Sequence, residues 1–589
     1  MYALKLKHAR VRAFSFLEVA RVGVYTFTAR PLFGALALTC AGLASAQSAG
    51  VQPVQIPGAV ESAAKQYITQ DTLIAPLRFL SSDLLEGRGP ATRGDELARA
   101  YLASELESLG YRPGGPHGGY QQPFDVVGIE TQVPDVWSFD AKGQKVDLKR
   151  SEEFIVSSGV QEPQSQISDA DLVFVGYGIE APEYKWNDFK GVNLKGKVLV
   201  MLNNDPDWDP KLFEGKRRLY YGRWVYKYES AARQGAAGAI IIHTTPSAGY
   251  PWQVVQTSWS GEQFELPAES EPRTKLKAWM TESAARKLLK ASGQDLDKLL
   301  AAAKSRSFKP VPLSIRTSLT TENKIARVKT ANVAGVLPGS DPKLKDEYVI
   351  FTAHHDHLGI GAVEAGKENV DRIYNGALDN ASGCAQVLAI ARAYASLKEK
   401  PRRSMLMLFV AAEEQGLLGS KYYSLHPTVK PGKMAANINF DGGNIWGRVN
   451  DLTLVGKGKS SLDAVADAVA AKQGRVVKAE ELIDRGFYYR SDQFSFAKIG
   501  VPALYFATGL DFVGRPKGWG KEQVEAFEAK DYHQPSDELR DDWRYEGMID
   551  DATLGLYSGW VVSQTDALPA WNKGDEFEAA RKKALAEAN

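Results

Sequence analysis

Short apolar runs alternate with helical segments through the second half of the chain, and this alternation constrains the fold most. From about residue 330, each strand-like run is almost continuously apolar, and a segment of helical periodicity follows it. Strands that are apolar on both faces belong in a sheet covered by helices on both sides. We therefore expect an α/β fold with a mostly parallel central sheet. The strand-like runs are "EYVIFTA", "RSMLMLFVAA", "MAANINF" and "VPALYFATG".

At 589 residues the chain exceeds what one hydrophobic core usually supports, so we expect several domains. Between about 130 and 320 the pattern changes to short β-type runs such as "KVLVMLNND" and "GAIIIHTT", which indicates a small β-rich insertion. It holds no cluster of His, Cys or paired carboxylates, so we expect it to shape substrate access and supply no metal ligand. The predicted divisions are a leader 1–46, the first part of the α/β domain 47–129, the insertion 130–322, the main α/β part 323–565 and a C-terminal tail 566–589.

The first 46 residues have the pattern of a signal peptide. Six basic residues against Glu18 alone give this leader a net charge of +5. An apolar stretch of about 15 residues, short for a membrane span, then ends in Ala44-Ser45-Ala46. We expect cleavage after Ala46, export to the periplasm or the medium, and no stable membrane insertion; an uncleaved N-terminal anchor is the alternative. From about 48 to 66 the sequence lacks clear periodicity, which predicts an N-terminal tail.

Composition excludes some classes of partner and constrains stability. The formal net charge is +1 and no long basic run occurs, so nothing favours a nucleic-acid partner. Of the two cysteines, Cys40 lies in the leader, which leaves Cys384 alone after cleavage. The mature chain cannot form an internal disulfide, so its stability must come from its core or from bound metal.

Polar side chains follow the buried strands where each strand ends. The stretch "FTAHHDHLG" alone holds three of the eight histidines. Singly, such residues are usually turn, surface or core-satisfied side chains. However, two adjacent glutamates directly after "MLMLFVAA" would be costly to bury without compensation, and a pair of divalent metal ions would compensate them. Imidazole with carboxylates and no thiolate suits zinc, with cobalt or manganese as alternatives. In chain order the side chains are His354, Asp356, Asp379, Glu413, Glu414, Asp441, Tyr532 and His533.

Five motifs in this order resemble the M28 family of di-zinc peptidases, which includes secreted bacterial aminopeptidases and the glutamate carboxypeptidase II group. The resemblance covers about 66–130 and 325–565. The middle segment, with "GYGIEAPEYKWNDFKGVNLKGKVLV" and "AARQGAAGAIII", resembles the protease-associated (PA) domain that many M28 enzymes carry as an insertion. The five motifs are "AHHDHLG", "GALDNASG", "AAEEQGLLGS", "NFDGG" and "YHQPSD".

The resemblance implies two zinc ions and assigns their ligands. Asp379 is implied to bridge the ions, with His354 and Asp441 completing one site and Glu414 and His533 the other. Spacing alone does not decide which glutamate and which aspartate serve which ion. Asp356 is implied to orient His354 from behind. His355 and His357 have no ligand counterpart, and we expect them to line the mouth of the site.

Peptide hydrolysis also needs a proton acceptor and a group that stabilises the oxyanion. Glu413 suits the role of general base, because it neighbours the ligand Glu414 and is itself free of the metals. Tyr532, next to the ligand His533, is a candidate donor to the tetrahedral oxyanion, with a packing role as the alternative. Arg490 is a further candidate for binding a substrate carbonyl or carboxylate, although a solvated surface position is favoured. Gln493 stands where relatives often have histidine, and "NFDGG" lacks their usual methionine.

The sequence therefore predicts an exported di-zinc exopeptidase acting on peptides, and an aminopeptidase above all. The alternatives are a carboxypeptidase and an M20-type amidohydrolase. M20 enzymes carry their extra domain after the glutamate pair, whereas here the insertion precedes His354 and only 92 residues separate Asp441 from His533. A one-zinc cyclotransferase is disfavoured because all five ligand positions are filled. From another class, a non-enzymatic receptor on a peptidase scaffold is disfavoured by the intact Glu413.

Overall fold

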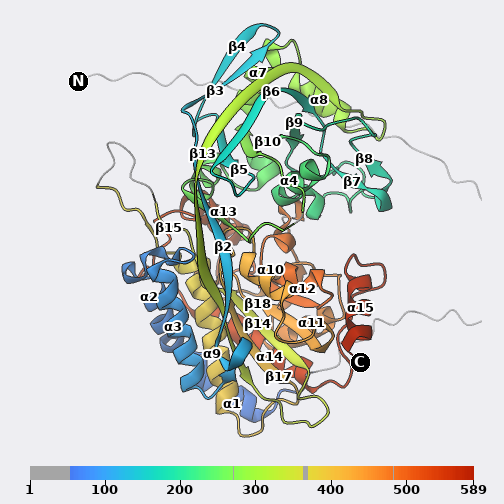
Figure 1. Cartoon of the computed structure of the whole chain (residues 1–589). Coiled ribbons are helices and arrows are strands. Elements are labelled where there is room, and N and C mark those ends of the chain that lie inside the picture. The colour runs from blue at the N-terminus through green and yellow to red at the C-terminus, as the bar shows by residue number, and fades with distance from the viewer. Residues whose placement is uncertain (1–53, 270, 362–368, 482, 589) are drawn as a thin grey trace, which may run out of the picture. The chain divides into compact units, whose positions relative to one another are not determined.

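A parallel sheet forms the centre of the second half of the protein in the computed structural model (Figure 1), which describes residues 54–269, 271–361, 369–481 and 483–588. The predicted signal peptide lies outside the described residues. β13 (Val311–Leu337) joins one edge of the sheet antiparallel, and β19 (Asp451–Leu454) and β20 (Val476–Ala479) extend the other. The parallel strands, in spatial order, are β17 (Ser404–Val410), β14 (Tyr348–His354), β18 (Met434–Asn439) and β21 (Ala503–Ala507).

Alternate residues of these strands enter hydrophobic cores on opposite faces of the sheet. Phe351 of β14 packs into a core with α9, whereas its neighbour Ile350 packs with Tyr423 and Phe496 on the other side. Both faces are buried, which explains the almost continuous apolar runs. The predicted fold class is confirmed. One face is covered by α1 (Gly58–Tyr67), α2 (Gln70–Leu80), α3 (Arg93–Ser108), α9 (Ser382–Ser396), α11 (Leu462–Lys472) and α14 (Glu546–Gln564), and the other by α10 (Leu418–Leu425) and α12 (Gln493–Lys498).

The two ends of the described chain are helical. The prediction of an N-terminal tail is wrong for residues 58–66, because α1 packs its small residues Ala63 and Ala64 into the core beside α9. Within the predicted C-terminal tail, α15 (Glu578–Ala588) is held by the buried Arg581, whose guanidinium donates to the main-chain oxygen of Met434 at 2.9 Å. No helix in the described part of the chain has both the length and the apolar character that a membrane crossing requires.

The middle of the chain forms a second sheet. One hydrophobic core here contains only residues of this part, and another also includes residues of the second half, such as Tyr488 and Phe577. The parallel strands of this sheet are β6 (Gln164–Phe174), β9 (Val198–Leu202), β10 (Gly238–His243) and β12 (Leu276–Thr281), and β5 (Phe154–Ser158) adds antiparallel to β12. The hairpin of β3 (Val136–Ala141) and β4 (Gln144–Lys149) and the helices α4 (Trp224–Arg233), α7 (Glu282–Ala291) and α8 (Leu296–Ala303) complete it.

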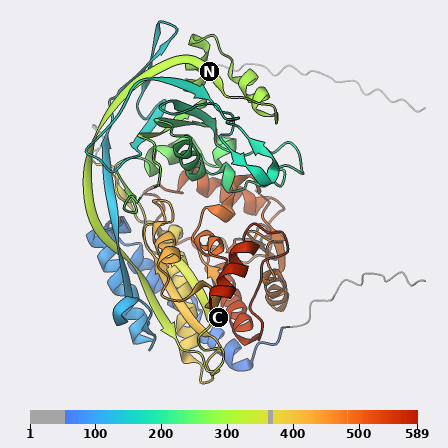
Figure 2. The ribbon, with the colours of Figure 1, turned by 45° about the vertical axis from the view of Figure 1, so that its right-hand side comes forward.

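Two long strands connect the sheets. The first half of β13 pairs with β6 and β3, and its last residues pair with β17. β2 (Gln121–Gln132) runs antiparallel beside β13 from Val333 to Glu322, as both views show (Figures 1 and 2). The predicted divisions at 129/130 and 322/323 fall within these two strands, so the polypeptide enters and leaves the insertion as continuous β-structure.

Candidate metal centre

The predicted metal ligands lie at the carboxyl edge of the parallel sheet or in loops that reach it. His354 is the last residue of β14 and pairs in register with Val410, the last residue of β17. The loop after β17 carries Glu413 and Glu414, and the loop after β18 carries Asp441. The carboxyl ends of parallel strands meet at one edge, which is why these side chains converge although they are far apart in sequence.

One cluster surrounds Nε2 of His354. Oδ1 of Asp379, in the loop before α9, lies 3.1 Å from this nitrogen, and Oδ1 of Asp441 lies 3.4 Å from it. The three side chains present ligand atoms close enough together to hold one metal ion. They are the residues that the family resemblance implies for one site.

A second cluster surrounds Nε2 of His533, which follows α13 (Trp519–Lys530). Oε2 of Glu414 lies 2.9 Å from this nitrogen, and Oδ2 of Asp379 lies 3.3 Å from it. The two carboxylate oxygens of Asp379 thus face different histidines, which is the arrangement that a bridging ligand needs. The structure brings all five predicted ligands together.

Glu413 lies further from His354 than the two aspartates of the first cluster do, with its Oε2 4.0 Å from Nε2 of His354. His354, Glu413 and Glu414 also present ligand atoms close enough together to hold a metal ion. Burial raises the pKa of Glu413, and although His354 opposes this, the charges of Asp441 and Glu414 hold that pKa well above its usual range. A buried carboxylate of raised pKa is a stronger proton acceptor than an exposed one.

Asp356 supports the glutamate pair as well as His354. Its carboxylate accepts hydrogen bonds from the main-chain N–H of Glu413 at 3.0 Å and of Glu414 at 3.4 Å. Nδ1 of His354 lies 3.2 Å from the main-chain oxygen of Asp356 and 3.7 Å from its carboxylate. One buried aspartate therefore fixes the strand ends that carry three of the predicted site residues.

The prediction that His355 and His357 line the mouth of the site is wrong. Both are buried, at 1% and 0% exposed. Nε2 of His355 lies 3.0 Å from Oδ1 of the buried Asp95, and Nδ1 of His357 lies 2.7 Å from Oε1 of Glu414. Because β14 ends inside the molecule, the residues that follow it turn into packed structure instead of reaching solvent.

Sequence reasoning gave no role to two buried residues that shape the loops. The guanidinium of Arg88 donates to the main-chain oxygens of His355 at 2.7 Å and of Gly376 at 3.0 Å. The carboxylate of Asp537 accepts from the main-chain N–H of Leu378 at 2.9 Å and of Asp379 at 3.0 Å. Asp537 is the last residue of the motif "YHQPSD", so its place in that motif was a signal that it belongs with the site.

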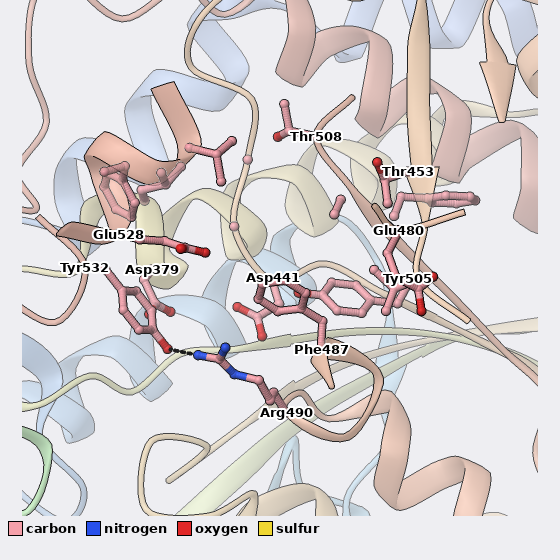
Figure 3. Close-up of a pocket in the computed structure, with 18 of the residues that line it drawn as sticks. Asp379, Asp441, Thr453, Glu480, Phe487, Arg490, Tyr505, Thr508, Glu528 and Tyr532 are labelled. Carbon is pink, nitrogen blue, oxygen red and sulfur yellow. Dashed lines mark hydrogen bonds between the residues drawn. The ribbon is translucent and has the colours of Figure 1, made fainter. Parts of the chain in front are cut away.

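Tyr532 and Arg490 lie beside the clusters (Figure 3). The guanidinium of Arg490 donates to the Tyr532 hydroxyl at 3.2 Å, and both side chains line a cavity with Glu413. The favoured solvated position for Arg490 is therefore wrong. Burial holds the pKa of Tyr532 well above its usual range although Arg490 opposes this, so the phenol keeps its proton. Gln493 is buried and bonds to Asn439 and Tyr488, away from the predicted ligands.

The donor set and its charges fit divalent metal ions. Nε2 of His533 is buried and makes no hydrogen bond, although two carboxylates face it. Burial would lower the pKa of His533, but Glu414 and Asp379 raise it to about 10. The carboxylates of Asp379, Glu414 and Asp441 crowd around the two imidazoles. Burying them together costs free energy unless further positive charge compensates them. Nitrogen and oxygen donors without a thiolate, in two groups that share one carboxylate, suit zinc.

Two cavities meet at this centre. The first has a volume of about 260 Å³ and aromatic walls, and the second has about 350 Å³. Four side chains line both cavities, so the predicted base lies where the two meet: Tyr250, Glu413, Arg490 and Tyr532.

Comparison with protein families agrees with this geometry. The model of peptidase family M28 matches residues 332–556, which hold all five predicted ligands. This segment of the chain is similar to peptidase family M28. The match disfavours the M20 alternative.

The curated relatives of this chain are distant. Leupeptin-inactivating enzyme 1 of Streptomyces exfoliatus is 27% identical over 257 residues, which are 42% of this chain and 51% of that enzyme. A probable leucine aminopeptidase 2 of Aspergillus oryzae is 28% identical over 239 residues, 38% of this chain and 43% of the relative. The chain thus spans about half the length of the curated relatives it matches.

Solved structures similar to this chain include two bacterial aminopeptidases. One, from Aneurinibacillus sp. strain AM-1, has a TM-score of 0.49 and 19% identity over 85% of this chain and 95% of that chain. The other, a zinc aminopeptidase from Bacillus subtilis, has a TM-score of 0.42 and 16% identity over 89% and 98% of the two chains.

Proposed function

We propose that this protein is a di-zinc aminopeptidase that removes N-terminal residues from peptides. The observation that carries the proposal is the position of Glu413, whose side chain is 10% exposed beside two clusters of metal-ligand type that share Asp379. His354, Asp379 and Asp441 would hold one ion, and Asp379, Glu414 and His533 the other. Two such ions polarise a peptide carbonyl and lower the pKa of the attacking water.

The protein's own groups supply the proton transfers. Glu413 accepts the proton of the attacking water and passes it to the leaving amine, a role for which its raised pKa suits it. The Tyr532 hydroxyl donates to the oxygen that becomes negative as the carbonyl is attacked. Arg490 holds this hydroxyl by its hydrogen bond and keeps a positive charge beside it.

The walls of the first cavity favour a large apolar N-terminal side chain. Their carboxylates away from the metal centre are largely neutralised: Glu480 pairs with Arg217 and Asp551 with Arg475. Asp441 and Glu413 line the same cavity, and their carboxyl oxygens can accept hydrogen bonds from an N-terminal amine. Aromatic rings make up much of the remaining wall: Phe440, Trp446, Phe487, Tyr505 and Phe527.

The second cavity is cationic and suits the leaving part of the peptide. Arg223, from the insertion, is only 9% exposed, and its Nε has no hydrogen-bond partner among the described residues. Burial and the neighbouring charge of Arg490 lower the pKa of Arg223 to about 9. Lys421 and Lys498 line the same cavity. A buried, unpaired guanidinium is satisfied by a carboxylate, so short peptides with a free C-terminus fit best.

The same guanidinium favours a second candidate function. A carboxypeptidase would place the C-terminal carboxylate of its substrate at Arg223 and release one residue from that end. In that case the first cavity would hold the residue that precedes the scissile bond, with no requirement for a free amine.

Peptides with blocked ends separate these functions. We expect hydrolysis of leucyl p-nitroanilide and of Leu-Gly-Gly, slower hydrolysis of amidated Leu-Gly-Gly, and no hydrolysis of the N-acetylated forms. Arg223→Ala should remove the preference for the free over the amidated C-terminus and leave the anilide rate unchanged. Cleavage of N-acetylated peptides alone would establish the carboxypeptidase, and no turnover on a broad panel with metal present would favour the non-enzymatic receptor.

We further propose that residues from about 130 to 322 form a PA-like inserted domain and that the protein is exported. A hydrophobic core made only of residues between Ile155 and Trp279 supports the first proposal. The basic leader, its short apolar stretch and Ala44-Ser45-Ala46 support the second. N-terminal sequencing of the protein recovered from the medium or the periplasm should begin at Gln47.

A further inference from the structure

A helix of the insertion reaches the second metal cluster. α6 (Trp252–Ser258) is fixed on one side by hydrogen bonds from Trp252 and Gln256 to the main-chain oxygen of Ser151. On the other side, the amide of Gln253 donates to the main-chain oxygen of Ala529 at 2.8 Å, in the last turn of α13. The helix therefore joins the insertion to the segment that carries His533.

The last residue of this helix contacts His533 directly. Oγ of Ser258 lies 2.7 Å from Nδ1 of His533, while Nε2 of the same ring faces Glu414 and Asp379. His533 also has a φ of 56°, in the left-handed region that residues with a side chain rarely adopt. Such a backbone conformation persists only where surrounding contacts hold it. The hydrogen bond between Ser258 and the His533 ring is one of these contacts.

The two predicted ligand histidines are oriented in different ways. Nδ1 of His354 faces the main-chain oxygen of Asp356, two residues further along its own loop. Nδ1 of His533 has no such local acceptor among the described residues; its partner is a hydroxyl 275 positions away in the sequence. A histidine that binds metal through Nε2 carries its proton on Nδ1, and the acceptor of that proton fixes both the tautomer and the ring plane.

We propose that Ser258 is a positioning residue of the metal centre, so that the insertion sets the tautomer and orientation of His533 as well as walling the cavities. The inference rests on the proposed two-metal function. It makes the affinity of one ion depend on a residue that the family match does not include. The other ion, at His354 and Asp441, has its orienting contacts within the M28 domain.

Zinc affinity tests this directly. In Ser258→Ala we expect one of two bound ions to be held about 10–100-fold more weakly in competition with a chelator, the usual effect of losing an orienting partner. The other ion should keep the parental affinity. Ser258→Thr keeps the hydroxyl and should restore tight binding. Thr257→Ala is the matched control, because the Thr257 hydroxyl bonds only within α6 among the described residues and should leave both affinities unchanged.

The outcomes distinguish this inference from the function beneath it. A parent protein that binds two ions, with a Ser258→Ala variant that holds both as tightly, overturns the positioning role alone. Equal weakening by Thr257→Ala, or no rescue by Ser258→Thr, also overturns it, because the effect would then be a general disturbance of α6. A parent that binds fewer than two ions overturns the two-metal function and this inference with it.

Discussion

At the scale of single residues, adjacent glutamates have different surroundings. Glu414 faces His533 and His357, and although burial opposes it, their charges lower its pKa to about 2. Glu413 faces Asp441 and has its pKa raised instead. The carboxylate of Asp356 accepts hydrogen bonds from the main-chain N–H groups of both glutamates. Their backbone is therefore held in one turn, from which the two side chains point toward different partners.

This difference predicts opposite effects for two matched substitutions. Glu413→Gln keeps the size of the side chain but removes the proton acceptor, so turnover should fall roughly 10²–10⁴-fold with both ions and peptide affinity retained. Glu414→Gln should instead weaken zinc binding, because a neutral amide poorly replaces an anionic ligand. Single-turnover rates and zinc content of the two variants check this. The reverse pattern would mean that base and ligand are exchanged.

Sequence analysis could predict the site residues that directly follow a strand. It could not predict the site residues that are brought to the centre by contacts between segments distant in the sequence. His354, Glu414 and Asp441 follow apolar strands, so their convergence is a consequence of parallel topology. Ser258 and Arg223 come from the insertion, and no spacing in the chain indicates that they meet the M28 domain.

At the scale of secondary-structure elements, the strands and helices of the second half were predictable because burial on both faces leaves a clear pattern. The helix α1 was not, since small residues such as Ala63 and Ala64 give little periodicity. The 27-residue β13 was also missed as one element. Its polar and apolar residues alternate only in parts, because its neighbours change from β6 to β2 to β17 along its length.

An ion-pair cluster ties the connecting strands to the insertion and predicts a pH effect. Glu265 ends β11 (Glu262–Glu265), which pairs with β2, and its carboxylate contacts Lys277 and Arg273. Burial alone would raise the pKa of Glu265, but the two cations lower it to about 2. Since the folded pKa is below the unfolded one, the pair stabilises the fold above pH ~4.5 and loses this effect as the pH falls toward 2.

Glu265→Gln should therefore lower the free energy of unfolding by about 3 kcal/mol at pH 7, and the difference from the parent should shrink below pH ~4.5. Urea unfolding at several pH values measures it. Glu262→Gln, on the same strand with no ion pair among the described residues, is the control and should change little. A constant difference between pH 7 and pH 3 would show that the effect comes from packing instead of charge.

At the scale of the whole molecule, two sheets share two continuous strands and one of their hydrophobic cores, and they meet at one chemical centre. The M28 domain supplies the predicted ligands and base, and the insertion supplies Tyr250, Arg223 and Ser258 around them. The sequence predicted both parts, but it did not predict that residues of both surround the same site. The insertion has no cluster of metal-ligand residues in its sequence, yet its side chains line both cavities and contact the predicted ligand His533.

Zinc titration of the metal-free protein tests the central claim most directly. Chelation should abolish hydrolysis of leucyl p-nitroanilide, and zinc added back should restore it, with full activity reached at two equivalents per chain. Direct zinc analysis of the restored protein should give the same stoichiometry. Activity that survives chelation, or that is complete at a single equivalent with no second ion bound, would contradict the two-metal account.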